Sequence, residues 1–246
     1  MAYVIKSRYL VAIAIALAAF FLASSPLAEG GLALKVNEIK IGPKNNHRGV
    51  LNATTCNVTD KPSTNYGLIG TNLPNLVPYR VNPSSAPSSV VIRSNLPTIV
   101  DNSFDIWSAA SGVTFNRGVD TSKTRASFDK QNIVAWGRLS RSTLGATYIW
   151  YVPSSGAVVE VDTILNSRLP WSWTNPTSTD VDQNCSSPTA YDVQNILVHE
   201  IGHWVGLDDL YDPEDEDLTM FGFGDKGELK KDTLESGDVS GASAIY

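Results

Sequence analysis

The stretch that decides the fold is HEIGH at residues 199–203, an H-E-x-x-H pattern. Apolar residues recur every three or four positions between residues 193 and 205, which predicts that the stretch lies on a helix. Residues four apart lie on one face of a helix, so His199 and His203 can both bind one metal ion at about 2.0–2.1 Å. Glu200 lies beside the first histidine, where its carboxylate can reach a water molecule at that ion. The pattern predicts a zinc site with Glu200 as its general base.

The two ends of this helix bear on the third zinc ligand. Thr189 fits the N-terminal cap, and Gly206 fits the C-terminal end, where a glycine lets the chain turn sharply. A catalytic zinc needs a third protein ligand and an open position for water. Asp209 can fold back under the metal after the turn, and Asp208 is a neighbouring alternative. No role is predicted for His47, the remaining one of three histidines.

The extended motif, which continues from H-E-x-x-H to Gly206 and Asp209, resembles that of the metzincins, whose last ligand is histidine or, in some members, aspartate. The resemblance gives Asp209 the role of third ligand. Metzincins also carry a methionine in a tight turn below the metal, and Met220 is the one methionine after the initiator. The resemblance therefore implies that Gly206 and Met220 support the site structurally. It is closest to the matrixin-like branch.

Periodicity and turn residues predict the other elements. A helix is expected at residues 96–110, with Gly112 as its stop. Strands are expected at residues 77–81, 113–115, 132–139, 145–152 and 157–165.

The resemblance to matrixins covers roughly residues 76–246. It includes residues 79–83 (first strand), 104–115 (first helix and next strand), 145–147 (edge strand), 160–162 (the strand beside it) and 233–246 (C-terminal helix). It implies a zincin-like α+β fold with a twisted, mostly parallel mixed β-sheet and an antiparallel edge strand. Two long helices, one of which carries the H-E-x-x-H motif, and a C-terminal helix complete that fold.

The family also implies where a substrate lies. A peptide is expected to bind in extended form against the edge strand, beside Gly145, Ala146 and Thr147. A peptide laid across the cleft in this way implies an endopeptidase that acts on proteins or peptides.

The chain departs from animal matrixins in several respects. Their cysteine-switch motif, P-R-C-G-x-P-D, is absent, and Cys56 lies in another context. A zinc-capping thiolate at Cys56, a disulfide with Cys185 and an inert role stay open. A second zinc site built on histidines cannot form, because no histidines are left for it. The acidic residues at 212–217 could bind Ca²⁺, but a solvated loop is favoured because no ordered ligand spacing is evident.

The N-terminal part suggests export. Lys6 and Arg8 precede an apolar run at residues 10–23 and then small residues, which is typical of a secretory signal peptide cut near Ala28. An uncleaved membrane anchor is the alternative, and in both cases the rest of the chain faces outside. Three parts are expected: a signal peptide at 1–28, an irregular lead-in or possible pro-segment at 29–75, and a catalytic domain at 76–246.

Composition excludes several functional classes. The chain has 246 residues, a net charge of −6 and a sequence pI near 5.0, which argues against a nucleic-acid partner. No stable membrane partner is expected unless the N-terminal segment is retained, and the protein is expected to be a monomer. The sequence predicts a secreted zinc-dependent endopeptidase. A zinc hydrolase of a non-peptide amide or ester, and a catalytically silent zinc-binding module, are the alternatives.

Overall fold

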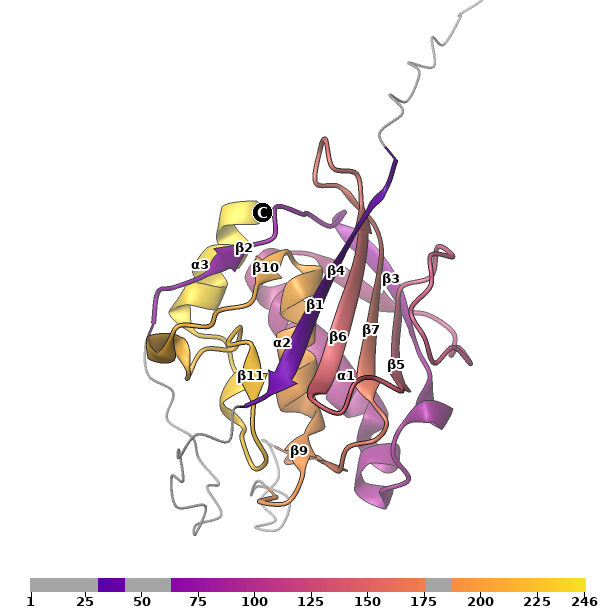
Figure 1. Ribbon diagram of the computed structural model, residues 1–246. Coiled ribbons are helices and arrows are strands. Elements are labelled where there is room, and N and C mark those ends of the chain that lie inside the picture. Colours follow the sequence, from indigo (N-terminus) through magenta and orange to yellow (C-terminus); the bar gives the residue numbers. More distant parts are fainter. Residues whose placement is uncertain (1–30, 43–62, 176–186) are drawn as a thin grey trace, which may run out of the picture.

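The computed structural model describes residues 31–42, 63–175 and 187–246. Its centre is a seven-stranded mixed sheet in the order β11-β1-β6-β7-β5-β3-β4 (Figure 1). The strands are β1 (Ala33–Ile41), β3 (Leu76–Val81), β4 (Thr114–Arg117), β5 (Ile133–Gly137), β6 (Thr143–Tyr151), β7 (Val158–Asn166) and β11 (Phe223–Gly224). The predicted signal peptide at 1–28 and the residues His47, Cys56 and Cys185 lie outside the described part.

Helices and small sheets complete the fold. The α-helices are α1 (Val90–Ser111), α2 (Val193–Trp204) and α3 (Ser236–Ile245). Short 3-10 turns occur at η1 (Pro83–Ser85), η2 (Pro213–Asp215) and η3 (Lys230–Asp232). Two small sheets pair β2 (Gly67–Leu68) with β10 (Leu207–Asp208), and β8 (Trp171–Ser172) with β9 (Tyr191–Asp192). In the described ranges, no helix combines the length and apolar character needed to cross a bilayer.

The sheet confirms the predicted fold class. Its pairings are parallel except for β6, which runs antiparallel to both of its neighbours, β1 and β7. The prediction that β6 lies at the edge is wrong, because β1 pairs along its whole length and β11 lies beyond β1. The strand expected to receive a substrate is therefore covered by another part of the same chain.

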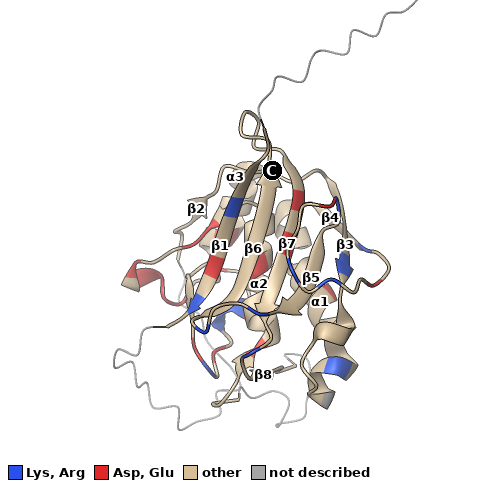
Figure 2. Cartoon of the chain, turned by 45° about the vertical axis from the view of Figure 1, so that its right-hand side comes forward, with Lys and Arg blue, Asp and Glu red and all other residues tan. Residues whose placement is uncertain are grey.

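The prediction of an irregular lead-in is wrong for residues 33–41, which form β1. Its apolar residues change phase along the strand: Leu34 and Val36 are on the exposed face, whereas Ile39 is on the buried face. Because apolar residues do not stay on one side, no period of two runs through the strand. The charged residues of β1 alternate in sign along the strand, from Lys35 to Glu38 to Lys40, and Figure 2 shows them in blue, red and blue.

Helix α2 is buried along its entire length and lies behind β1 and β6 in the view of Figure 1. Two tryptophans join it to its neighbours. The indole N–H of Trp107 on α1 donates to the Val198 carbonyl at 2.7 Å, and that of Trp204 donates to Thr163 Oγ1 on β7 at 2.8 Å. Buried polar groups that are fully paired hold packed elements in one arrangement. The helix that carries the histidines is therefore rigidly placed between α1 and the sheet.

The start of α2 differs from the prediction. Asp192, and not Thr189, is the N-cap: its Oδ1 accepts from the Asn195 N–H at 3.0 Å and its Oδ2 from the Thr174 N–H at 2.7 Å. The residues before the helix cannot be helical because Tyr191 and Asp192 pair with β8. A long-range strand pairing decides this helix boundary, and local spacing does not reveal it.

Candidate metal centre

His199 and His203 present one ring nitrogen each to the same space. The Nδ1 of His199 lies 2.8 Å from the Thr219 carbonyl oxygen, and the Nδ1 of His203 lies 2.8 Å from that of Leu207. A carbonyl oxygen only accepts, so each Nδ1 carries a proton, and in a neutral ring Nε2 then offers its lone pair. The two rings lie 4.9 Å apart and perpendicular to each other.

Asp209 completes this group. Its Oδ1 lies 3.2 Å from the Nε2 of His199 and 3.5 Å from that of His203. Within the described residues, these three atoms are buried and have no hydrogen-bond partner. Buried polar atoms are otherwise almost always hydrogen-bonded. Three unpaired atoms with lone pairs that converge on one space therefore fit a metal ion as its ligands. His199, His203 and Asp209 are also the single group of potential metal ligands found in the described ranges.

The charge states of His203 and Asp209 suit a cation. Burial lowers the pKa of His203 to about 4, so its imidazole is neutral at pH 7. Burial alone would raise the pKa of Asp209, but the neighbouring His203 and His199 outweigh it and lower that pKa to about 2. Neutral imidazole and ionised carboxylate are the forms that bind metal. Asp208 is directed elsewhere: its Oδ1 accepts from the backbone N–H of Asp209 at 3.1 Å.

Glu200 lies next to this group and is fully buried. The hydroxyl of Thr147 on β6 donates to its Oε2 at 2.6 Å, while Oε1 has no hydrogen-bond partner in the described part of the chain. A side chain at Gly145 would overlap Oε1, so β6 accommodates the carboxylate only because this residue is glycine. Burial raises the pKa of Glu200 well above its usual range. The hydrogen bond from Thr147 lowers this pKa, but its effect is smaller than that of burial.

Gly206 and Met220 shape the chain around the ligands. Gly206 has φ of +102°, and a Cβ there would lie 2.5 Å from the Thr71 carbonyl oxygen. Only glycine fits this turn, which sends the chain from α2 back to Asp209. The sulfur of Met220 lies directly against Gly202, at the position that a Cβ of that residue would take. Met220 is therefore packed under the H-E-x-x-H turn of the helix.

The segment that carries Asp209 is tied to the turn that carries Met220. Leu210 donates its N–H to the Met220 carbonyl at 2.9 Å and accepts at 2.8 Å from the N–H of Gly222. The turn itself is closed by the N–H of Phe221, which donates to the Leu218 carbonyl at 3.1 Å. The third candidate ligand and the methionine turn therefore form one hydrogen-bonded unit.

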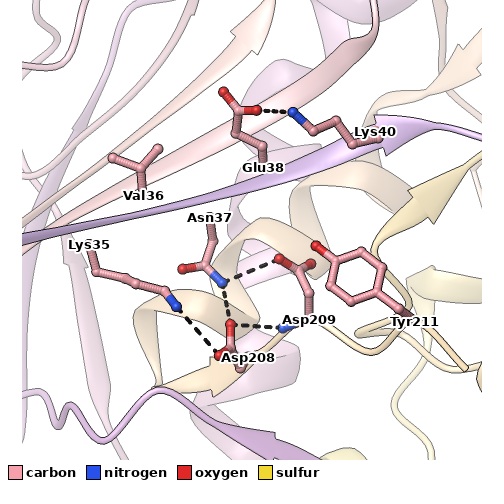
Figure 3. Close-up of a pocket in the computed structure, with 8 residues that line it drawn as sticks. All are labelled: Lys35, Val36, Asn37, Glu38, Lys40, Asp208, Asp209 and Tyr211. Atoms are coloured by element: carbon pink, nitrogen blue, oxygen red, sulfur yellow. Dashed lines mark hydrogen bonds and ion pairs between the residues drawn. The ribbon is translucent and has the colours of Figure 1, made fainter.

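Two residues at the site have no counterpart among the predicted ones. Asn37 points from β1 toward both aspartates, and its Nδ2 donates to Asp208 Oδ1 at 2.6 Å and to Asp209 Oδ2 at 3.3 Å (Figure 3). Tyr211 lies beside Asp209, and burial, together with that carboxylate, raises its pKa to about 12. The proximity of Tyr211 to Asp209 in sequence could have suggested it. Asn37 lies too far away in the sequence for any local pattern to find it.

The residues predicted to bind substrate are all paired with β1 through the sheet. Gly145, Ala146 and Thr147 pair with Ile39, Glu38 and Asn37 in register. A pocket of about 470 Å³ remains on the other side of β1, between this strand and Asp208, Asp209 and Tyr211 (Figure 3). The substrate-binding role of the three β6 residues stays a prediction.

The acidic segment at residues 212–217 does not assemble a second metal site among the described residues. Part of it forms η2, and Asp215 accepts from the side-chain amide of Asn65 at 2.7 Å. The predicted possibility of Ca²⁺ binding gains no support from this arrangement.

Comparison with known proteins assigns the family. A search of curated protein sequences finds no match for this chain. A family model described as Matrixin, a peptidase family, matches residues 74–246. The match begins within two residues of the predicted start of the catalytic domain and includes every candidate ligand. Because it covers well over half of the sequence, the chain belongs to the matrixin family of zinc-dependent metallopeptidases.

Proposed function

We propose that this protein is a secreted zinc endopeptidase that hydrolyses internal peptide bonds of extended protein substrates. The observation that carries the proposal is the set of three unpaired, buried ligand atoms of His199, His203 and Asp209 beside the buried carboxylate of Glu200. A metal-binding group next to a candidate base with a raised pKa is the arrangement expected for metal-assisted hydrolysis.

Glu200 is the proposed general base. Its carboxylate removes a proton from the attacking water and later delivers it to the leaving amine. The raised pKa helps this exchange, because a carboxylate of ordinary pKa is a weak base at neutral pH. Thr147 holds one oxygen of the carboxylate and leaves the other free for the proton. Zinc, when bound by the three ligands, would supply a Lewis acid that polarises the carbonyl of the bond to be broken.

The test compares the purified chain with Glu200→Gln. The variant keeps the size and one acceptor of the side chain but cannot act as a base. Both proteins are expected to bind one zinc ion, while casein hydrolysis by Glu200→Gln falls by about 10²–10⁴-fold. Glu214→Gln, at an exposed glutamate of the loop after Asp209, is the matched control and should retain full activity. Zinc binding without hydrolysis that depends on Glu200 would contradict the proposal.

A further inference from the structure

Strand β1 is bound on both sides through its backbone. It runs antiparallel to β6 and parallel to β11. The N–H of Ile41 donates to the Ser142 carbonyl at 2.8 Å, and that of Lys40 donates to the Gly222 carbonyl at 3.0 Å on the opposite side. An extended peptide that adds to an existing strand is held in this way, and its alternate side chains enter pockets.

The side chains of β1 that point inward match the groups they meet. The amide of Asn37 bonds both aspartates at the metal centre. Two residues further, Ile39 is fully buried against an apolar surface. The side chains of Leu144, Ile196 and Ile39 all lie around Gly224 of β11. This glycine has no side chain, which leaves space for them. The strand is thus polar above the ligands and aliphatic in the neighbouring pocket.

The backbone of β1 also crosses the candidate base. Ile39 pairs with Gly145, the residue against which the Glu200 carboxylate lies. Asn37, on the other side of Glu38, contacts Asp209. A base that returns a proton to a leaving amine must lie beside the nitrogen of the bond that breaks. Along β1, that nitrogen belongs to the Glu38–Ile39 bond.

We propose that β1 is a substrate-like strand and that its Glu38–Ile39 peptide bond is a self-processing site. The proposal rests on the proposed peptidase function. Water adds across the bond: its oxygen joins the carbonyl carbon of Glu38, the C–N bond breaks, and the nitrogen of Ile39 leaves as an amine with the proton. The chain up to Glu38 then leaves β6. Until this step, β1 keeps the strand at Gly145 from pairing with any other peptide.

The first experiment follows processing in the full chain, prepared free of zinc and then loaded with it. The wild-type protein is expected to produce a new N-terminus at Ile39, observed by N-terminal sequencing and intact mass, whereas Glu200→Gln stays uncut there. Hydrolysis of a fluorogenic peptide should show a lag that ends as Ile39 is exposed. A protein that hydrolyses casein through Glu200 while the Glu38–Ile39 bond stays intact would overturn this proposal and leave the proposed function standing.

The second experiment avoids changes to the fold. A synthetic peptide with the β1 sequence ALKVNEIKI is offered to the active enzyme, and it should be cut into ALKVNE and IKI. The peptide equivalent of Ile39→Ala should be cut at least about tenfold more slowly, because the aliphatic pocket is left partly empty. The equivalent of Leu34→Ala, an exposed position of β1, is the matched control and should be cut at the original rate. Cleavage at another bond, or equal rates for both variants, would overturn the proposal.

Discussion

At the scale of single residues, the site depends on which of two adjacent aspartates faces the histidines. Asp209 places Oδ1 within 3.5 Å of both Nε2 atoms, whereas Asp208 binds the Asn37 amide and the backbone N–H of Asp209. Sequence spacing left both residues open, and only the family resemblance favoured Asp209. The turn at Gly206, where φ is +102°, brings both aspartates back beside the histidines, and Asp208 pairs with Gly67 of β2.

Loss of a residue that only supports a metal ligand weakens metal binding by roughly 10–100-fold. Asp209→Ala removes a candidate ligand itself, so it should weaken zinc binding by more than that. Asp208→Ala should retain one zinc per chain, because its carboxylate is not among the converging ligand atoms. Zinc content after dialysis against a graded chelator measures both variants. Loss of zinc from Asp208→Ala alone would show that the ligand assignment is wrong.

Gly202→Ala should lower the free energy of unfolding by about 1–3 kcal/mol, since the new methyl group would overlap Met220 Sδ and lie 2.8 Å from the Trp107 ring. Met220→Ala should relieve part of that overlap. The loss of unfolding free energy in the double variant is therefore expected to be about 0.5–3 kcal/mol smaller than the sum of the losses in the two single variants. Denaturant unfolding of the four proteins gives this coupling. Gly31→Ala, in open space, is the control, and strict additivity at the Gly202–Met220 pair would contradict the packing.

At the scale of elements, helix α2 was predictable and strand β1 was not. The α2 pattern is local, because apolar residues recur at helical spacing and the two candidate ligands His199 and His203 lie four residues apart on one face. The pairing of β1 with β6 joins distant parts of the sequence, and the apolar residues of β1 change sides between Val36 and Ile39. Its buried Asn37 is placed by partners that no local window contains.

The cap of α2 can be tested with two substitutions. Asp192→Ala should cost about 1–3 kcal/mol of stability, because it leaves the buried N–H groups of Asn195 and Thr174 without their acceptor. Thr189→Ala, at the residue that local spacing favoured, should change stability by less than about 0.5 kcal/mol. Urea unfolding at one pH measures both. A larger effect at Thr189 would restore the original assignment of the cap.

Strand β7 carries a titrating carboxylate that makes stability depend on pH. Burial raises the pKa of Asp162 from 3.8 to about 7, against the opposing N–H groups of Ser127 and Ile133. Between these two values the folded chain holds a proton that the unfolded chain has lost. Stability from this group is therefore present below about pH 4 and falls as the pH rises through about 7.

Asp162→Asn removes that titration, so its melting temperature should fall less between pH 5 and pH 8 than that of the wild-type chain. Asp120→Asn, at an exposed aspartate, is the matched control and should follow the wild type. Differential scanning calorimetry of zinc-loaded proteins provides the comparison. Parallel curves for wild type and Asp162→Asn would refute the assigned cause.

At the scale of the whole molecule, the zincin-like fold class was predictable because its mixed sheet and helices follow from strong local patterns and from the family resemblance. The covered state of β6 was not predictable, because it arises from a strand outside the segment that resembles matrixins. The same strand, β1, places Asn37 against Asp208 and Asp209 of the candidate metal centre. Strand β1, which sequence patterns describe least well, therefore covers β6 and contacts the two aspartates of the candidate site.

The central claim is that His199, His203 and Asp209 bind one catalytic zinc beside Glu200. Anomalous diffraction at the zinc edge from zinc-loaded Glu200→Gln crystals tests it most directly, since this variant keeps the ligands and should leave β1 uncut. The account predicts one strong peak about 2.0–2.2 Å from both Nε2 atoms and from the Asp209 carboxylate. A peak bound by other residues, or no peak between the two histidines, would contradict it.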